Sequence, residues 1–301
     1  MKPKKGPREW IFFGRPWGEW FFLPVIALLG LNAIRNGLGE EFSGVRQWSV
    51  QAGNIVSGLA ALGVVAATVT GRAVGIVLLW VFALTVCVVA PMAAWSYGDA
   101  SISGAFSAFL GTALACLGIV WYGTRRLHAS ITLRKWPALM ADHAAAADEF
   151  AAAISRMSAA EWVARPAPEA WSPAETTDHL ARTYSQFAGE ARGKNSLRIR
   201  LGPVRRTLAR LFVKPRLLSG AAFPKARSPR ELRPSSGPAT PADGVALFRA
   251  TGDACLRDLE ILHVRHPYRR MVHPYLGALP LYEIIQFASQ HVRHHRRQLP
   301  S

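Results

Sequence analysis

The chain has 301 residues, half of them apolar, and a formal net charge of +17. Three widely spaced cysteines without a CxxC pair argue against both a disulfide framework and a zinc ribbon. The apolar residues crowd into the first 125 positions and most charged residues follow them, so the sequence predicts one part in lipid and one part in water.

The first 125 residues contain four apolar runs. They lie at about Trp20–Ile34, Ala52–Thr70, Ala73–Trp95 and Ile102–Tyr122. The last three are long enough to cross about 30 Å of hydrocarbon, and none contains a charged residue. Residues 1–125 are therefore predicted to form a transmembrane helical domain of about four spans. The first run is short, and its alternative is a signal peptide; we favour an uncleaved span because no clear cleavage site follows it.

Basic residues in the short connections set the expected orientation. One side of the membrane would carry Lys2, Lys4, Lys5, Arg8, Arg72, Arg125, Arg126, Arg134 and Lys135. The opposite side has few, and acidic residues offset them, so both termini are predicted to be cytoplasmic in a bacterial inner membrane. Because the last three runs hold no Asp, Glu, Lys, Arg or His, we expect an anchor or assembly module rather than a transport path.

A basic linker, residues 123–135, precedes the soluble part, residues 136–301. Helices are predicted at about residues 137–157, 173–192, 242–264 and 280–297, with a basic segment near residues 196–213 and a long loop at residues 214–243. The second helix opens with Ser172, Pro173 and Glu175, the pattern of a capping box with proline at the first helical position. Four main helices with one long connection indicate an all-α bundle.

The final helix carries His291 and His295, four residues apart and therefore on one face. Such a pair can chelate a divalent metal, and His179 on another core-facing position could supply a third ligand. The alternative is a solvated basic tail, and His294, three residues from His291, could compete for the site. The remaining histidines are interpreted as surface or turn residues: His143, His263, His266 and His273.

Several motifs then resemble a known family. They are Trp171-Ser-Pro-Ala-Glu-Thr-Thr-Asp-His-Leu180, Phe223-Pro-Lys225, Arg230-Glu-Leu-Arg-Pro234, His273-Pro-Tyr-Leu-Gly-Ala-Leu279 and His291-Val-Arg-His-His-Arg-Arg-Gln-Leu299. In this order they resemble the DinB/YfiT-like superfamily over about residues 139–299. The resemblance implies a four-helix bundle whose His179, His291 and His295 bind zinc or nickel. The membrane part and the basic helix near Arg205 and Arg206 depart from the family's single-domain pattern.

This resemblance implies a membrane-anchored, metal-dependent thiol transferase or hydrolase, acting with a low-molecular-weight thiol and a small-molecule substrate. The alternative is a non-catalytic helical module that binds a partner or anionic lipid at the cytoplasmic face of the membrane, because residues 136–301 hold 24 Lys/Arg against 14 Asp/Glu. We expect membrane lipid as a partner. We disfavour nucleic acid because the basic runs contain no recognition motif.

Overall fold

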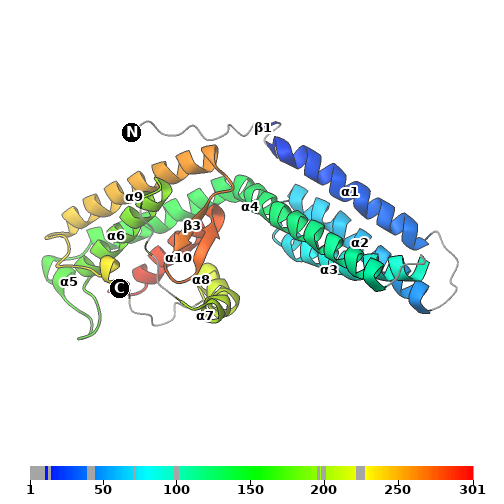
Figure 1. Cartoon of the computed structure of the whole chain (residues 1–301). Coiled ribbons are helices and arrows are strands. Elements are labelled where there is room, and N and C mark those ends of the chain that lie inside the picture. Colours follow the sequence, from blue (N-terminus) through cyan, green and yellow to red (C-terminus); the bar gives the residue numbers. More distant parts are fainter. Residues whose placement is uncertain are drawn as a thin grey trace. The chain divides into compact units, whose positions relative to one another are not determined.

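The computed structural model describes residues 11–12, 15–38, 45–70, 72–97, 102–194, 197, 201–221 and 228–300. The chain divides into two compact units, Met1–Arg134 and Lys135–Ser301. Nearly all of its regular structure is helical, as Figure 1 shows, in agreement with the predicted all-α class. Two short antiparallel strand pairs add to it: β1 (Ile11–Phe12) with β2 (Arg15–Pro16), and β3 (Arg270–His273) with β4 (Gly277–Pro280).

The first unit contains α1 (Trp17–Leu38), α2 (Val45–Thr70), α3 (Val74–Tyr97) and the N-terminal part of α4 (Ile102–Ser155). Small residues let these helices approach closely. A Cβ on Gly58 of α2 would lie 2.6 Å from the carbonyl oxygen of Gly30 on α1, and one on Gly53 would lie 2.2 Å from Val89 on α3. The buried side chains between the helices include Ile26, Val64 and Leu79.

Two helices among the described residues are long and apolar enough to cross a membrane, Trp48–Thr70 and Val74–Ala93. This corrects the prediction of about four spans. Among the described residues the first run provides only a shorter apolar stretch, Phe22–Asn36. The fourth run includes residues 102–105 and 108, whose side chains lie outside the described part of the chain.

Large apolar side chains point outward from both long apolar helices. Leu59 on α2 is 59% exposed, and Val77 and Leu84 on α3 are each 61% exposed. A core helix of a water-soluble protein would bury such side chains, whereas a helix in lipid has no reason to. The exposed apolar side chains of α2 and α3 are therefore more stable in an apolar environment than in water.

Helix α4 differs from its prediction. A linker was expected at residues 123–135 and a new helix after Pro137, but α4 continues through both. Within the first unit, Leu127 and Ile131 are fully buried, and the Ser130 hydroxyl donates to the Thr68 carbonyl at 3.0 Å. These contacts stabilise the helical conformation of residues 123–135, where the charge pattern had indicated a linker. The boundary between the two units falls inside α4, after Arg134.

The second unit is a helical bundle. Its long helices are the C-terminal part of α4, α6 (Pro173–Ala191), α9 (Pro241–Arg265) and α10 (Leu281–Arg296). Short elements connect them: α5 (Ala159–Val163), α7 (Pro203–Leu208), the π-helical turn η1 (Ala209–Val213), α8 (Lys214–Ser219) and the 3-10 turn η2 (Arg230–Leu232). The predicted loop at residues 214–243 thus contains α8 and η2, while residues 222–227 lie outside the described part.

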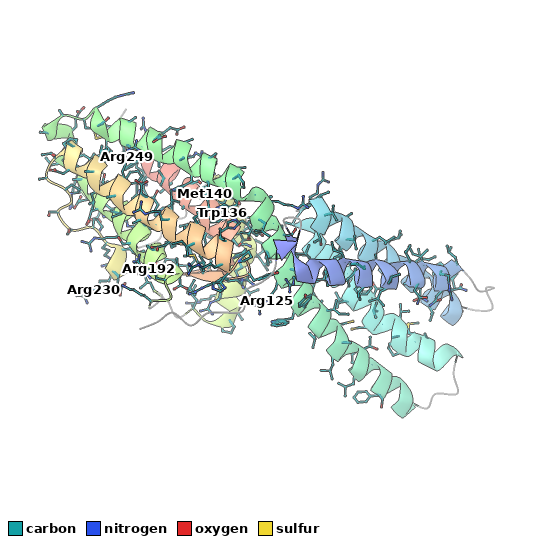
Figure 2. The ribbon with its side chains drawn as sticks, turned by 90° about the horizontal axis from the view of Figure 1, so that it is seen from above. Arg125, Trp136, Met140, Arg192, Arg230 and Arg249 are labelled. Carbon is teal, nitrogen blue, oxygen red and sulfur yellow. The ribbon has the colours of Figure 1, made fainter. Side chains whose placement is uncertain are left out.

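Helices α4 and α9 run antiparallel along one side of this bundle. The Trp136 indole donates to the Glu260 carboxylate near one end, and Arg249 pairs with Asp148 at 3.0 Å near the other. Figure 2 labels Trp136 and Arg249 on these two helices. The same indole stacks on the His263 ring, with centroids 4.3 Å apart. His263 is therefore a buried packing residue and not the surface residue that was predicted.

His143 on α4 also corrects its prediction, since it is 1% exposed. The Tyr184 hydroxyl lies 3.0 Å from His143 Nε2 and forms a hydrogen bond with it. Burial lowers the pKa of His143 to about 4. The histidine is thus a buried core residue whose Nε2 is hydrogen-bonded and whose Nδ1 has no hydrogen-bond partner among the described residues. Of the four histidines named above as surface or turn residues, only His266 is exposed.

This burial makes the stability of the bundle depend on pH. Between the ordinary pKa of 6.5 and about 4, the unfolded chain binds one more proton at His143 than the folded chain does. The free energy of unfolding therefore falls by up to about 1.4 kcal/mol per pH unit on acidification through this window. In His143→Gln, whose side-chain amide can keep a hydrogen bond with Tyr184 as donor or acceptor, this contribution is absent.

The measurement is the thermal unfolding midpoint of the full-length chain in detergent at about pH 7 and about pH 5. We expect the midpoint of His143→Gln to fall less on acidification than that of the wild type, and His266→Gln to behave as the wild type. Equal losses in all three proteins would contradict this role for His143.

Candidate metal centre

The first histidine of the site is placed by the start of α6. The Ser172 hydroxyl accepts from the Glu175 backbone N–H, and the Glu175 carboxylate accepts from the Ser172 N–H at 2.8 Å. This is the capping box that the sequence predicted, with Pro173 at the first helical position. It fixes the first turn, so that His179, two turns further on, faces the bundle interior and is 5% exposed.

The other two histidines come from α10. The hairpin β3–β4 leads directly into this helix, and Gly277, with φ of +74°, makes the tight turn between the strands. One face of α10 is buried in the core through Ile284, Ala288 and Val292. His295 lies near this face and is 6% exposed, whereas His291 is only partly buried and borders a cavity.

The three imidazoles converge on one point. The Nε2 atom of His291 lies 3.3 Å from Nε2 of His179 and 3.0 Å from Nε2 of His295. One nitrogen from each of the three rings falls within 4.8 Å of the others, so the group could hold a metal ion. Three nitrogens at about 2.0–2.1 Å from a tetrahedral zinc ion would stand about 3.3 Å apart. The two separations from His291 are close to that value, and all three nitrogens lie within 4.8 Å of one another.

Hydrogen bonds at Nδ1 orient the rings of His179 and His295, and so direct the lone pairs of their Nε2 atoms. His179 Nδ1 donates to the carbonyl of Leu232 in η2 at 2.7 Å. His295 Nδ1 donates to the Gln298 amide oxygen, also at 2.7 Å. A neutral imidazole that carries its proton on Nδ1 presents an unprotonated Nε2, which is the form that binds metals.

His294 does not belong to this group. Its Nε2 atom is 3.0 Å from the Gln298 amide nitrogen, which donates to it. Gln298 therefore holds His294 through its nitrogen and His295 through its oxygen. The predicted competition between His294 and the site is resolved by this arrangement, in which the His294 ring is turned toward Gln298.

Two carboxylates near His179 in sequence serve other contacts. Asp178 accepts from the Ser235 backbone N–H at 2.8 Å and from Arg182 at 2.9 Å, which fastens the segment after η2 to α6. Glu175 is occupied by the cap and by Arg165. The group that orients His179 is thus a backbone carbonyl, which no pattern of side chains in the sequence could have indicated.

Aromatic rings and burial keep the three imidazoles neutral. Trp171 lies against His179, with centroids 4.8 Å apart, and Phe287 stacks on His291 at 5.3 Å. Burial lowers the pKa of His179. Burial and the neighbouring imidazoles together hold the pKa values of His291 and His295 well below the usual range. Neutral imidazoles have available lone pairs, so no proton must leave before a metal binds.

A cavity of about 1010 Å³ adjoins the three histidines. Its lining is mainly apolar and includes Phe187, Val213, Leu217, Tyr275, Leu276 and Phe287. Among the described lining residues Glu169 is the only Asp, Glu, Lys or Arg. A cavity of this volume is in the range of small-molecule sites.

His273 flanks the β3–β4 turn, and its place in the cavity lining was not predicted from the sequence. It was assigned to a surface or turn, but it is 7% exposed at the end of β3 and lines the cavity. Its Nδ1 atom accepts from the backbone N–H groups of Tyr275 and Leu276, both at 3.3 Å. Burial lowers its pKa to about 4. The ring is therefore neutral with its proton on Nε2, and the His273-Pro-Tyr-Leu-Gly277 motif was the signal for it.

Comparison with known proteins agrees with this architecture. The sequence model of the DinB superfamily matches residues 142–299, slightly more than half of the chain and the region that holds all three histidines. No curated protein and no solved structure matches the chain.

Substitutions of Gln298 test whether its hydrogen bond to His295 orients that imidazole for metal binding. In Gln298→Leu the His295 Nδ1–H loses its acceptor, so we expect zinc affinity to fall by about 10–100-fold. In Gln298→Glu a carboxylate oxygen replaces the amide oxygen, and the affinity should stay near that of the wild type. Competition against a zinc-binding dye, with the full-length chain in detergent, gives the affinities. Unchanged affinity in Gln298→Leu would show that this contact does not aim the ligand.

Proposed function

The chain belongs to the DinB superfamily, and we propose that it is a membrane-anchored protein that holds a divalent transition metal, zinc or nickel, at His179, His291 and His295. The single observation that carries the proposal is the convergence of three Nε2 atoms, two of them at 3.0 and 3.3 Å from the third. The separations, the neutral rings and the nitrogen-only ligand set all fit such an ion.

Three protein ligands leave a coordination position open, as in catalytic rather than structural zinc sites. A metal held there would supply a Lewis acid that lowers the pKa of a thiol or a water molecule at neutral pH. We propose on this basis a transferase that uses a low-molecular-weight thiol, or a hydrolase, acting on a small-molecule substrate. The cavity lined by the three histidines gives such a substrate room beside them.

The residues of the chain perform three tasks in this proposal. The histidines bind the ion, and Leu232 and Gln298 orient two of them through their Nδ1–H groups. Trp171 and Phe287 cover the imidazoles with apolar rings and so exclude water from their flanks. Exclusion of water strengthens every electrostatic interaction at the reacting centre.

His273 has a fourth task, as a hydrogen-bond donor to the substrate. Its Nδ1 is occupied by the Tyr275 and Leu276 N–H groups, so the proton on Nε2 is the one that it can offer. The surrounding cavity wall is largely apolar, and a single fixed donor there would orient a substrate carbonyl or ester oxygen. Because burial holds the His273 pKa at about 4, this donor is a neutral imidazole across the physiological pH range.

The membrane anchor of the proposal rests on the two helices that are apolar enough to span, Trp48–Thr70 and Val74–Ala93. We propose a multi-pass protein of the inner membrane with both termini in the cytoplasm. An even number of spans keeps both termini on one side. The basic residues Arg125, Arg126, Arg134 and Lys135 favour the cytoplasm for that side. The Arg125 and Arg126 guanidinium groups lie over the rings of Trp121 and Tyr122, a pairing typical of membrane interfaces.

Metal content tests the proposal directly. We expect the wild-type full-length chain, purified in detergent and reloaded with zinc or nickel, to retain about one ion per chain. His291→Ala and His295→Ala should each lose it, because two imidazoles bind a divalent ion far more weakly than three. His266→Ala, at an exposed histidine outside the group, is the matched control and should retain the ion.

Elemental analysis after gel filtration gives the ratio, and the far-ultraviolet circular dichroism of each variant checks that the helices remain. A wild type that retains no transition metal even after reloading would reject the metal centre. Equal retention by the wild type and by His291→Ala would place the metal elsewhere.

A further inference from the structure

The chain between α6 and α9 contains a segment with two apolar faces. It comprises α7, η1 and α8, residues Pro203–Ser219, and is labelled at α7 and α8 in Figure 1. Its inner face is formed by Ala209, Val213 and Leu217, which pack against the bundle core and line the cavity beside the histidines. This face accounts for why the segment folds onto the bundle.

The outer face has no such partner in the described part of the chain. Val204 is 70% exposed, Leu208 48%, Leu211 60% and Phe212 62%. Four large apolar side chains within nine residues form a contiguous patch, because residues three, four and seven apart share one side of a helix. Water-soluble surfaces rarely expose such patches unless they bind something.

The segment is also strongly basic. Residues 203–219 contain Arg205, Arg206, Arg210, Lys214 and Arg216 and no Asp or Glu. Arg210 and Lys214 serve the fold, since they contact the Ala278 carbonyl at 2.6 Å and the Glu283 carboxylate at 2.7 Å. Arg205 and Arg216 are exposed beside the apolar patch. The outer surface therefore combines apolar side chains with positive charge.

The contacts of Arg210 with Ala278 and of Lys214 with Glu283 fix the segment on the bundle, so that its outer face stays exposed. Buried Leu217 and the hydrogen bond from the Gln286 amide to the Leu218 carbonyl, at 3.0 Å, secure its C-terminal end. The patch is thus displayed on a fixed platform attached to α10 and the β3–β4 hairpin. A fixed platform binds without the entropic cost of ordering a flexible chain.

We propose that the outer face of α7–α8 docks on an anionic lipid surface, with Val204, Leu208, Leu211 and Phe212 inserted at the headgroup boundary and Arg205 and Arg216 beside the phosphates. Amphipathic basic helices bind membranes in this way, through buried apolar area and about 1 kcal/mol per basic residue near the surface. The inference relies on the proposed membrane anchoring, because the two apolar helices of the chain would keep a lipid surface nearby.

The chemistry of the patch favours lipid over other partners. A nucleic-acid surface would pair the arginines but would leave four large apolar side chains in water. If a second copy of the chain docked through the same segment, the five basic residues of one copy would face the five of the other. Like charges repel, so this contact would be unfavourable. Anionic lipid satisfies the charged and the apolar side chains together.

Docking would have a consequence for the cavity. Because α7–α8 lines the cavity with its inner face, a membrane on its outer face would lie about one helix diameter, roughly 10 Å, from the cavity wall. The metal centre would then work beside the bilayer, where amphiphilic molecules concentrate.

The test uses a fluorescent label at the centre of the patch. Leu211→Cys in the full-length chain is labelled with an environment-sensitive dye and reconstituted in nanodiscs, either of neutral lipid or of mixed neutral and anionic lipid. Val163→Cys, at an apolar residue of α5 that is 63% exposed, is the matched control. The wild-type chain labelled in parallel gives the background from Cys87, Cys116 and Cys255.

We expect the dye at residue 211 to shift to the blue in anionic nanodiscs and to be quenched by nitroxide-labelled lipid, while the dye at residue 163 does neither. Arg205→Gln with Arg216→Gln should reduce the quenching. Raising the salt from about 0.1 M to about 1 M should also reduce it, because the Debye length falls from about 10 Å to about 3 Å.

Three results would overturn the docking proposal. One is a dye at residue 211 that stays as water-exposed as the dye at residue 163. Another is a blue shift without lipid quenching, which would mean that protein covers the patch. The third is lipid quenching that neither the arginine substitutions nor salt reduces, which would mean that anionic charge plays no part.

Failure of the anchoring is a separate result. A chain that stays in solution without detergent contradicts the anchor, and the same labelled variants are then mixed with preformed anionic vesicles. Quenching there would support docking without an anchor, and its absence would overturn docking as well.

Discussion

Two hydrogen bonds on the far sides of imidazole rings define the centre of this protein. The Leu232 carbonyl takes the Nδ1 proton of His179, and the Gln298 amide oxygen takes that of His295. Each bond fixes a ring orientation and leaves an unprotonated Nε2 directed at His291. Without these bonds the rings of His179 and His295 would be free to turn; with them, the three histidines form a group that could hold a metal ion.

The bundle is arranged so that these two bonds can form. The capping box at Ser172 fixes the first turns of α6, and Asp178 fastens the chain after η2 to that helix through the Ser235 N–H. This contact keeps Leu232 within reach of His179. On the other side, the β3–β4 hairpin leads into α10, and the turn after this helix brings Gln298 back onto His295. The same hairpin carries His273 into the cavity, so the proposed substrate contact and the proposed metal ligation depend on neighbouring elements.

Local patterns predicted the parts of this site that depend on local chemistry. The cap at Ser172 and the one-face spacing of His291 and His295 follow from helix geometry alone. His179 was a candidate because of its core-facing position on another helix, and the family resemblance then supported it. The patterns did not reveal Leu232, Gln298 or His273, because their roles depend on where a loop, a last turn and a hairpin lie in space. Similarly, a basic, polar stretch before Pro137 indicated a linker, but the buried contacts of Leu127 and Ile131 keep it helical. His143 and His263 were misplaced for the same reason, since Tyr184 and Trp136 are distant in sequence.

The most direct test of the account is the coordination shell of the metal-loaded, full-length chain, measured by X-ray absorption at the zinc edge. The account predicts three imidazole nitrogens at about 2.0 Å, with their outer-shell scattering, and one further light ligand. A sulfur ligand at about 2.3 Å, or a shell with fewer than three imidazoles, would contradict it, because the ion would then be bound somewhere other than between α6 and α10.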